Sequence, residues 1–401
     1  TMQPAEPQNT LTISTATKTS SLATKTISPT KTQDSANPFT QIARASDFGG
    51  KITDLWYDPE SQQVFLSSLK GFYHISDDSW APLFSQSVIE ILGKDDAGRI
   101  WTLTSGGNSI TSWNGISAST YGEKMGWTAP HSKNYLGFGF GDQIVTDQTN
   151  RVYLTTGFDD LRRFESDISA WRSLSPRELT FKALERPDSQ EYFLTDVIKS
   201  SSDHIWVSSC IGDGEKLLGN GLRRLDGNTW KEILELQDQC ILDLESDSAG
   251  RVWAAGVDAL FAYNPNTDSW TKYSIPEDYH GRQSILDIQL DSKERPWLIA
   301  MRGGSAKKYG SLAIYFFPYS DWVKVYETES WQPVSIYPDM KGEIVYCLNG
   351  GVYETISAKP QLIGRLSPGK CIVQTDANGQ IWIAMLDGID TGLWLYNPDN
   401  Q

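Results

Sequence analysis

A set of acidic residues recurs at one position of a repeated sequence pattern, and these residues are the first candidates for chemistry. Asp54, Asp196, Asp243 and Asp287 each lie four residues before a turn sequence, and Glu90 lies one residue off that position. If these side chains line a common channel, they form an acidic collar that could bind a cation such as calcium, or a basic group. Alternatively, each carboxylate accepts backbone N–H groups of a neighbouring repeat, because buried donors need acceptors.

The four cysteines follow the same repeat. Cys210 and Cys240 belong to consecutive repeats, and so do Cys347 and Cys371. Each pair would join neighbouring repeats at matched heights, which predicts two disulfides and an oxidising compartment. Four buried thiols are the alternative, since a free cysteine packs as a small apolar residue.

The elements that must position these residues are short β-strands, seen most clearly between Cys240 and Ile275. This stretch predicts four strands, at Ile241–Ser246, Arg251–Ala255, Leu260–Tyr263 and Trp270–Ile275. Glycine, proline and aspartate mark the turns between them. Four antiparallel strands in so short a segment are typical of one β-propeller blade, which must stack on neighbours to bury its two faces.

Degraded copies of this blade fill the rest of the chain. Their second strands are indexed by Phe65, Trp101, Tyr153, Trp206, Trp253, Trp297, Tyr346 and Trp382, which predicts an all-β, eight-bladed propeller over residues 37–401. The last copy stops after its third strand. Phe39–Arg44 resembles a fourth strand, and we expect it to complete the eighth blade and close the ring, because closure removes exposed sheet edges.

The repeat resembles a known family. Trp253 with Ala259–Tyr263, and Trp382 with Gly392–Tyr396, resemble the two-component-regulator propeller repeat of bacteria, over roughly residues 38–399. The resemblance implies an extracellular sensor module that is usually fused to a membrane helix and a kinase. Neither follows the repeats here, so we expect a free-standing propeller, secreted or tethered, that does not signal by phosphotransfer.

The composition limits the classes of partner that we expect this protein to bind. The chain carries 35 basic and 50 acidic residues, a formal net charge of -15. This charge disfavours nucleic acid and anionic membrane surfaces, and no apolar run approaches the roughly 18 residues of a membrane helix. Residues 1–36 are Ser/Thr-rich and predict a disordered segment, either an extracellular stalk that tethers the propeller to the cell surface or a plain tail.

The longer insertions are all expected on one rim, where the connections from strand two to three and from blade to blade lie. They comprise Tyr121–Gly141, Pro176–Tyr192, Ile211–Asn220, Pro276–Arg282, Arg302–Gly310 and Leu386–Thr391. Aromatic and polar residues there are candidate ligand contacts: Trp127, His131, Tyr135, Tyr279, His280, Arg282, Arg302, Lys307 and Tyr309. The alternative is that the long loop packs on itself.

Two classes of function remain. No metal-ligand spacing surrounds the histidines, and no nucleophile elbow or phosphate loop occurs. We therefore expect a monomeric, non-catalytic module without a cofactor that binds a small molecule, glycan or protein at the long-loop rim. The alternative is a channel-centred polysaccharide lyase, glycosidase or metal-dependent lactonase that uses the acidic collar.

Overall fold

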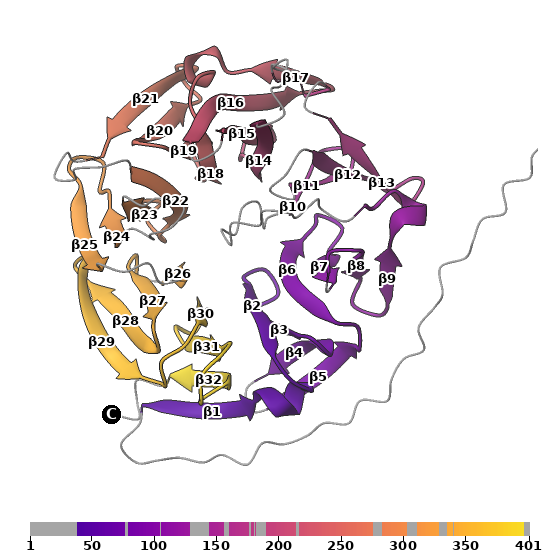
Figure 1. Ribbon diagram of the computed structural model, residues 1–401, viewed down its shortest axis with the longest axis vertical. Coiled ribbons are helices and arrows are strands. Elements are labelled where there is room, and N and C mark those ends of the chain that lie inside the picture. Colours follow the sequence, from indigo (N-terminus) through magenta and orange to yellow (C-terminus); the bar gives the residue numbers. More distant parts are fainter. Residues whose placement is uncertain are drawn as a thin grey trace, which may run out of the picture.

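The computed structural model describes residues 38–76, 79–104, 106–128, 144–155, 160–175, 178–179, 181, 190–213, 216–275, 283–302, 311–328, 335–339 and 341–396. Within these ranges, eight four-stranded antiparallel sheets stand in a ring around a common axis as the blades of a β-propeller (Figure 1). This confirms the predicted fold class and blade number. Helical structure there is limited to three 3₁₀ turns, η1 (Ala45–Phe48), η2 (Glu123–Met125) and η3 (Leu234–Leu236). No helix in the same ranges is long and apolar enough to cross a membrane.

Seven blades are simple meanders, with strands paired in chain order from the channel outward. The first three are β2 (Ile52–Asp58), β3 (Gln63–Ser68), β4 (Gly71–Ser76) and β5 (Ser79–Phe84); β6 (Val88–Lys94), β7 (Ile100–Thr104), β8 (Ile110–Trp113) and β9 (Ala118–Tyr121); and β10 (Ile144–Thr146), β11 (Val152–Thr155), β12 (Leu161–Glu165) and β13 (Ala170–Leu174).

The next four meanders follow the same plan. They are β14 (Gln190–Lys199), β15 (Ile205–Asp213), β16 (Lys216–Asp226) and β17 (Thr229–Glu232); β18 (Ile241–Ser246), β19 (Val252–Gly256), β20 (Ala259–Asn264) and β21 (Ser269–Ser274); β22 (Gln283–Leu290), β23 (Pro296–Arg302), β24 (Ser311–Phe316) and β25 (Val323–Thr328); and β26 (Ser335–Pro338), β27 (Ile344–Leu348), β28 (Gly351–Ile356) and β29 (Lys359–Arg365).

The eighth blade closes the ring by joining the two ends of the repeat region. It contains β30 (Cys371–Thr375), β31 (Ile381–Met385) and β32 (Gly392–Tyr396), and its outermost strand is β1 (Phe39–Arg44). β1 runs antiparallel to β32, with Phe39 opposite Tyr396 and Arg44 opposite Gly392 (Figure 1). The predicted closure by the N-terminal strand is therefore confirmed, and β32 has no exposed edge.

The aromatic residue that indexes each repeat lies in the core between blades. All eight have at most 2 % of their surface exposed. Trp253, for example, packs in one cluster with Ile285 and Leu298 of the following blade. Trp382 of the last blade packs with Ile52 and Leu55 of the first. The repeat is thus conspicuous in sequence because stacked blades need a large apolar residue at the same height.

In several repeats, a buried aspartate fixes the turn that precedes the aromatic residue. One carboxylate oxygen of Asp95 accepts the backbone N–H groups of Ala97 at 3.1 Å and Arg99 at 2.9 Å. The other accepts the indole N–H of Trp101 at 2.7 Å. The same side-chain bond joins Asp147 to Tyr153, Asp291 to Trp297 and Asp376 to Trp382. The six-residue spacing is therefore a hydrogen-bonded unit that ties each turn to the core.

The two rims of the ring differ in their connections. Between first and second strands, seven blades use five residues and one uses four. Between third and fourth strands, the connections have two to six residues. On the opposite rim, the connections range from two residues between β3 and β4 to 22 residues between β9 and β10. We call these the short-turn rim and the long-connection rim.

One expected insertion is not a loop. The sequence predicted a loop at Ile211–Asn220, but β15 and β16 continue through most of it and pair up to Asp213 and Lys216. β14 extends alongside, with Gln190 opposite Asp213. The extra residues therefore lengthen three strands of this blade, and the ladder continues past a bulge near Cys210.

Candidate functional site

The predicted acidic collar lies on the innermost strands, and its aspartates bind the backbone of the next blade. Asp196 on β14 accepts the N–H of Leu244 on β18 at 2.9 Å. Asp243 on β18 accepts the N–H of Ile288 on β22 at 2.8 Å. The same relation joins Asp54 on β2 to Ile91 on β6, at 2.8 Å. These three carboxylates therefore hold neighbouring blades together.

Two of these aspartates act with the threonine that precedes them. The hydroxyl of Thr195 donates to the carbonyl oxygen of Ile241 at 2.6 Å, and that of Thr53 donates to the carbonyl oxygen of Val88 at 2.8 Å. Each Thr-Asp pair thus satisfies one carbonyl and one N–H of the next blade. Such a two-point contact fixes both the spacing and the height of the neighbouring first strand.

Glu90 occupies the collar position despite its offset in sequence. Ile91, whose N–H binds Asp54, directly follows Glu90, just as Leu244 follows Asp243. Counted back from the turn, Glu90 lies one residue away from the position that the aspartates occupy in their repeats. However, β6 contains a second register shift, between Ile91 and Gly93. This bulge absorbs the additional residue and returns Glu90 to the ring.

The carboxylates at one side of the collar interact electrostatically. Burial raises the pKa of Asp243 well above its ordinary value, and the charges of Asp196 and Asp287 on the two adjacent blades raise it further. The hydrogen bond from Ile288 acts in the opposite direction, because it stabilises the ionised form. Like charges held this close cost free energy at neutral pH.

These contacts favour the structural interpretation of the collar over the catalytic one. One oxygen of each of the three aspartates is already bound to a backbone N–H of the next blade. Across the described ranges, no group of three or more His, Cys, Asp or Glu side chains is arranged to hold a metal ion. At these three boundaries the position of the aspartate is explained by blade docking.

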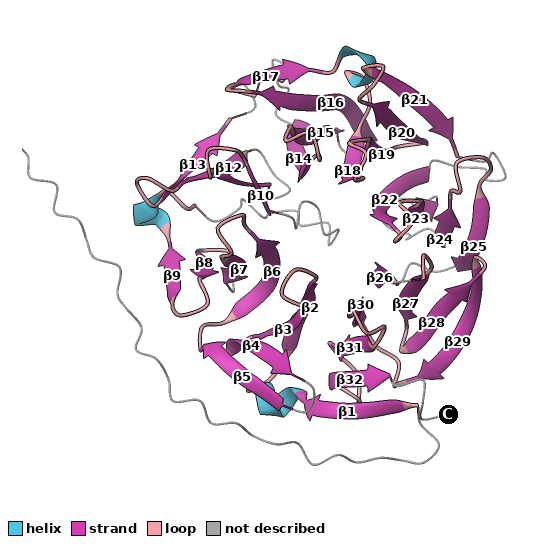
Figure 2. Ribbon diagram, turned by 180° about the vertical axis from the view of Figure 1, so that it is seen from behind, coloured by secondary structure: helices cyan, strands magenta, loops and turns pink. Residues whose placement is uncertain are grey.

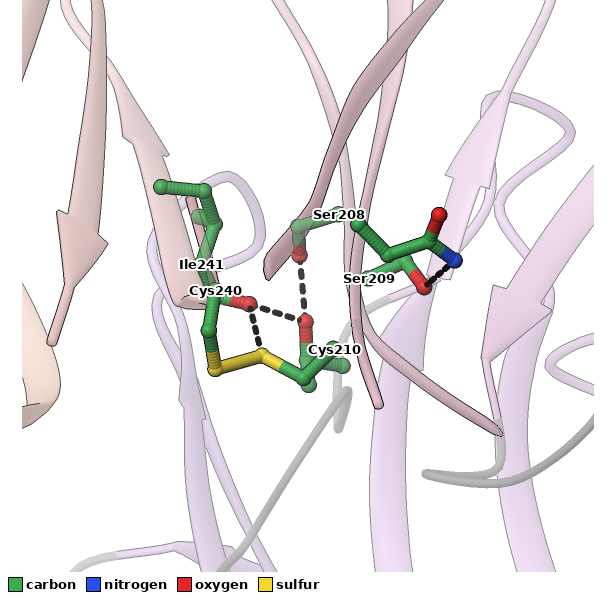
Figure 3. Close-up of a disulfide and its surroundings, with 7 residues drawn as sticks. Ser208, Ser209, Cys210, Cys240 and Ile241 are labelled. Atoms are coloured by element: carbon green, nitrogen blue, oxygen red, sulfur yellow. Dashed lines mark hydrogen bonds between the residues drawn. A yellow bond between two sulfur atoms is a disulfide. The ribbon is translucent and has the colours of Figure 1, made fainter. Parts of the chain in front are cut away.

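Disulfides reinforce two of the blade boundaries. Cys210 on β15 is bonded to Cys240, directly before β18, with 4.7 Å between their Cα atoms (Figure 3). Cys347 on β27 is bonded to Cys371 on β30, with 6.0 Å between Cα atoms. These are the pairs expected from the repeat, and all four residues are buried. The first bridge lies beside the contact of Thr195 with Ile241, so covalent and polar contacts share one boundary.

The prediction that Trp127 offers a contact surface to a ligand is wrong. Its side chain is fully buried, and its indole N–H donates to the carbonyl oxygen of Gly107 at 2.9 Å. Its ring meets that of Trp171 edge to face, with 5.1 Å between centroids. Gly126 allows this approach, because a Cβ there would lie 1.9 Å from the carbonyl oxygen of Trp171. The start of the long connection therefore packs against residues of two neighbouring blades.

Most of the other predicted rim residues lie outside the described ranges. These are His131, Tyr135, Tyr279, His280, Arg282, Lys307 and Tyr309. Arg302 ends β23, where its backbone pairs with Gln283 and Ser311. This position places it at the long-connection rim, as the sequence predicted.

The long-connection rim also contains a pocket that the sequence did not predict. It has a volume of about 400 Å³ and lies between the β31–β32 connection and the end of β1. Gln41, Arg44, Asp390 and Trp394 are among its lining residues. The insertion Leu386–Thr391 and the closing strand were each recognised, but only ring closure shows that the two segments meet.

Comparison with known proteins supports the fold alone. No family model and no curated protein matches this chain. Among solved structures, the Dos1 propeller is similar over 90% of this chain and 94% of that chain, with a TM-score of 0.56 and 8% identity. A streptogramin B lyase covers 86% of this chain and 93% of its own, with a TM-score of 0.45 and 13% identity.

The extracellular domain of a one-component system of B. thetaiotaomicron matches 84% of this chain and 50% of that chain, with a TM-score of 0.42 and 13% identity. The similarity to the Dos1 propeller supports the propeller architecture, and no family model places this chain in the two-component-regulator sequence family.

Proposed function

We propose that this propeller is an extracellular, non-catalytic recognition module that binds its ligand at the long-connection rim. The observation that carries the proposal is the sorting of connection lengths described above. Insertions without a role would fall on both rims, yet the connections of eight or more residues all lie on one. Loops held by a rigid scaffold are the usual position of binding residues.

The chemistry of the two rims agrees with this division. On the short-turn rim, turns bind the neighbouring blade, as in the bonds from Ser248 N–H to Glu294 and from Ala377 N–H to the Tyr57 hydroxyl. The collar carboxylates are engaged between blades. Extra residues are therefore accommodated on the long-connection rim, where binding residues are usually found on a rigid scaffold.

Two buried disulfides support an extracellular location. Disulfides persist in oxidising environments and are rare in reducing ones, and both bridges here join separate blades. In this proposal, residues 1–36 tether the propeller to the cell surface, and the protein acts as a monomer toward a glycan, small molecule or protein.

The test is to exchange connections on the two rims. The full chain is first screened on a glycan microarray and against a phage-displayed peptide library. Residues 303–310 are then replaced by Asn-Gly, the pair that joins β27 to β28. We expect this variant to lose captured ligands while its melting temperature stays within a few degrees of the parent.

The matched control inserts eight Gly and Ser residues between Gly227 and Asn228, on the short-turn rim. We expect the control to bind like the parent. The proposal is wrong if neither screen yields a ligand, or if the insertion abolishes binding while the shortened connection leaves it unchanged.

A further inference from the structure

The pocket at the ring closure has a floor made of two paired residues. Gln41 on β1 and Trp394 on β32 are directly opposite each other, so their side chains lie side by side on one face of the sheet. Trp394 is half-buried, and its indole N–H donates to the carbonyl oxygen of Asp390 at 2.8 Å. The ring is therefore held in one orientation, with part of its surface exposed. Figure 2 shows β1 beside β32, with η1 at the end of β1.

The wall of the pocket is held by reciprocal hydrogen bonds. The backbone N–H of Ser367 donates to the Asp390 carboxylate at 2.6 Å, and the Ser367 hydroxyl accepts the N–H of Asp390 at 2.9 Å. The carbonyl oxygen of Thr391 accepts the N–H of Ala45 at 3.2 Å, which joins the wall to the chain after β1. A pocket whose lining is fixed in this way loses little entropy when it binds a ligand.

The charges of the lining have both signs. Arg44 is exposed, and no ion pair within the described ranges involves its guanidinium. Asp390 supplies a carboxylate from the β31–β32 connection, and Gln41 and Ser46 add groups that both donate and accept. A simple anion would meet the charge of Asp390, and a simple cation would meet that of Arg44. The lining suits a neutral ligand that carries several hydroxyl groups.

We propose that this pocket binds one pyranose ring of a glycan. A sugar offers an apolar face for the exposed part of Trp394 and vicinal hydroxyls that can both accept from Arg44 and donate to Asp390. The volume of about 400 Å³ is adequate for one or two sugar rings. The proposal rests on the proposed function, because the pocket lies on the same rim, and it names the ligand class and a site on the closing blade.

The experiment uses the full chain on a microarray of neutral, N-acetylated and acidic glycans, followed by calorimetry with the strongest binder. Arg44→Ala and Gln41→Ala remove polar contacts from exposed or half-buried positions, so both variants should fold. We expect each to weaken binding at least about 5-fold. Trp394→Phe keeps a ring but loses the bond to Asp390, and it should weaken binding less than Trp394→Ala.

The matched control is Arg172→Ala, which removes an exposed arginine from β13, the outermost strand of another blade. It should bind like the parent. The proposal is overturned if no glycan on the array binds, or if binding survives both Arg44→Ala and Gln41→Ala. Should the peptide screen succeed where the glycan array fails, the pocket proposal falls and the recognition function stands.

Discussion

The carboxylate of Asp196 accepts the backbone N–H of Leu244 from the next blade, at 2.9 Å, and that of Val197 from its own strand, at 2.7 Å. A side chain that could have served as an acid or base is thus engaged in docking two blades. Asp54 makes the same pair of contacts, to Ile91 and Leu55. Together with Asp243, which binds Ile288, these residues give the acidic position a docking role at three blade boundaries.

Removing that acceptor should destabilise the ring. Asp196→Ala leaves a buried N–H of Leu244 without its partner, and we expect the free energy of unfolding to fall by about 1–3 kcal/mol. Asp196→Asn keeps an acceptor oxygen and should cost less. Urea unfolding followed by tryptophan fluorescence measures both. Asp167→Ala, at an exposed turn, is the control and should change little; equal losses in Asp196→Ala and this control would contradict the docking role.

Asp243 should make stability depend on pH in a defined direction. Because its pKa is raised in the folded state, its protonated form favours folding. That contribution is complete below the unfolded pKa of about 4 and is lost as the pH rises through the folded value. Asp243→Asn keeps an acceptor for Ile288 and carries no charge, so it should be more stable than the parent at pH 7.

The measurement compares urea midpoints of the two proteins between pH 4 and pH 7. The advantage of Asp243→Asn should shrink toward pH 4, because the parent carboxyl becomes protonated in the folded state as the pH falls. Asp167→Asn controls for the general loss of one negative charge. A difference that stays constant across this range, or a less stable variant at pH 7, would refute the electrostatic account.

The closing strand should matter far more than the residues before it. Deletion of residues 1–36 should leave the melting temperature unchanged. Deletion through Arg44 removes Phe39, Ile42 and Ala43, all buried, and exposes the edge of β32. We expect the free energy of unfolding to fall by several kcal/mol, since a buried large apolar side chain contributes about 1.5–3 kcal/mol. We also expect the truncated protein to self-associate through the free edge of β32. Equal melting temperatures would show that β1 is dispensable.

The bridge between Cys210 and Cys240 should stabilise the ring. The double variant Cys210→Ser, Cys240→Ser opens a loop with a sequence separation of 30 residues. We expect it to lose about 2–4 kcal/mol. Mass spectrometry of a non-reduced digest checks the pairing, and recovery of four free thiols from the native protein would contradict both bridges.

Trp127 should behave as a core residue. Trp127→Ala removes a fully buried indole that packs against Trp171, and we expect a loss of about 3–5 kcal/mol. Chemical denaturation measures it, with Ile116→Ala as control, since Ile116 is 89% exposed. A stable Trp127 variant would return this side chain to the candidate ligand contacts.

The sequence by itself determined the repeat, the number of blades and the means of closure. Each depends on local patterns: the turn aspartate and the aromatic residue six positions on, as in Asp95 and Trp101, form one hydrogen-bonded unit within a single hairpin. The cysteine pairs were also predictable, since residues at matched positions of adjacent repeats meet when the blades stack.

Only the tertiary structure decided how the exceptions are accommodated. A bulge in β6 returns Glu90 to the collar, and a close approach at Gly126 buries Trp127. The pocket between Arg44 and Asp390 exists because the two ends of the repeat region pair in one sheet. These outcomes depend on contacts between residues far apart in the chain, and a strand or turn pattern, which is set by neighbours in sequence, carries no information about such contacts.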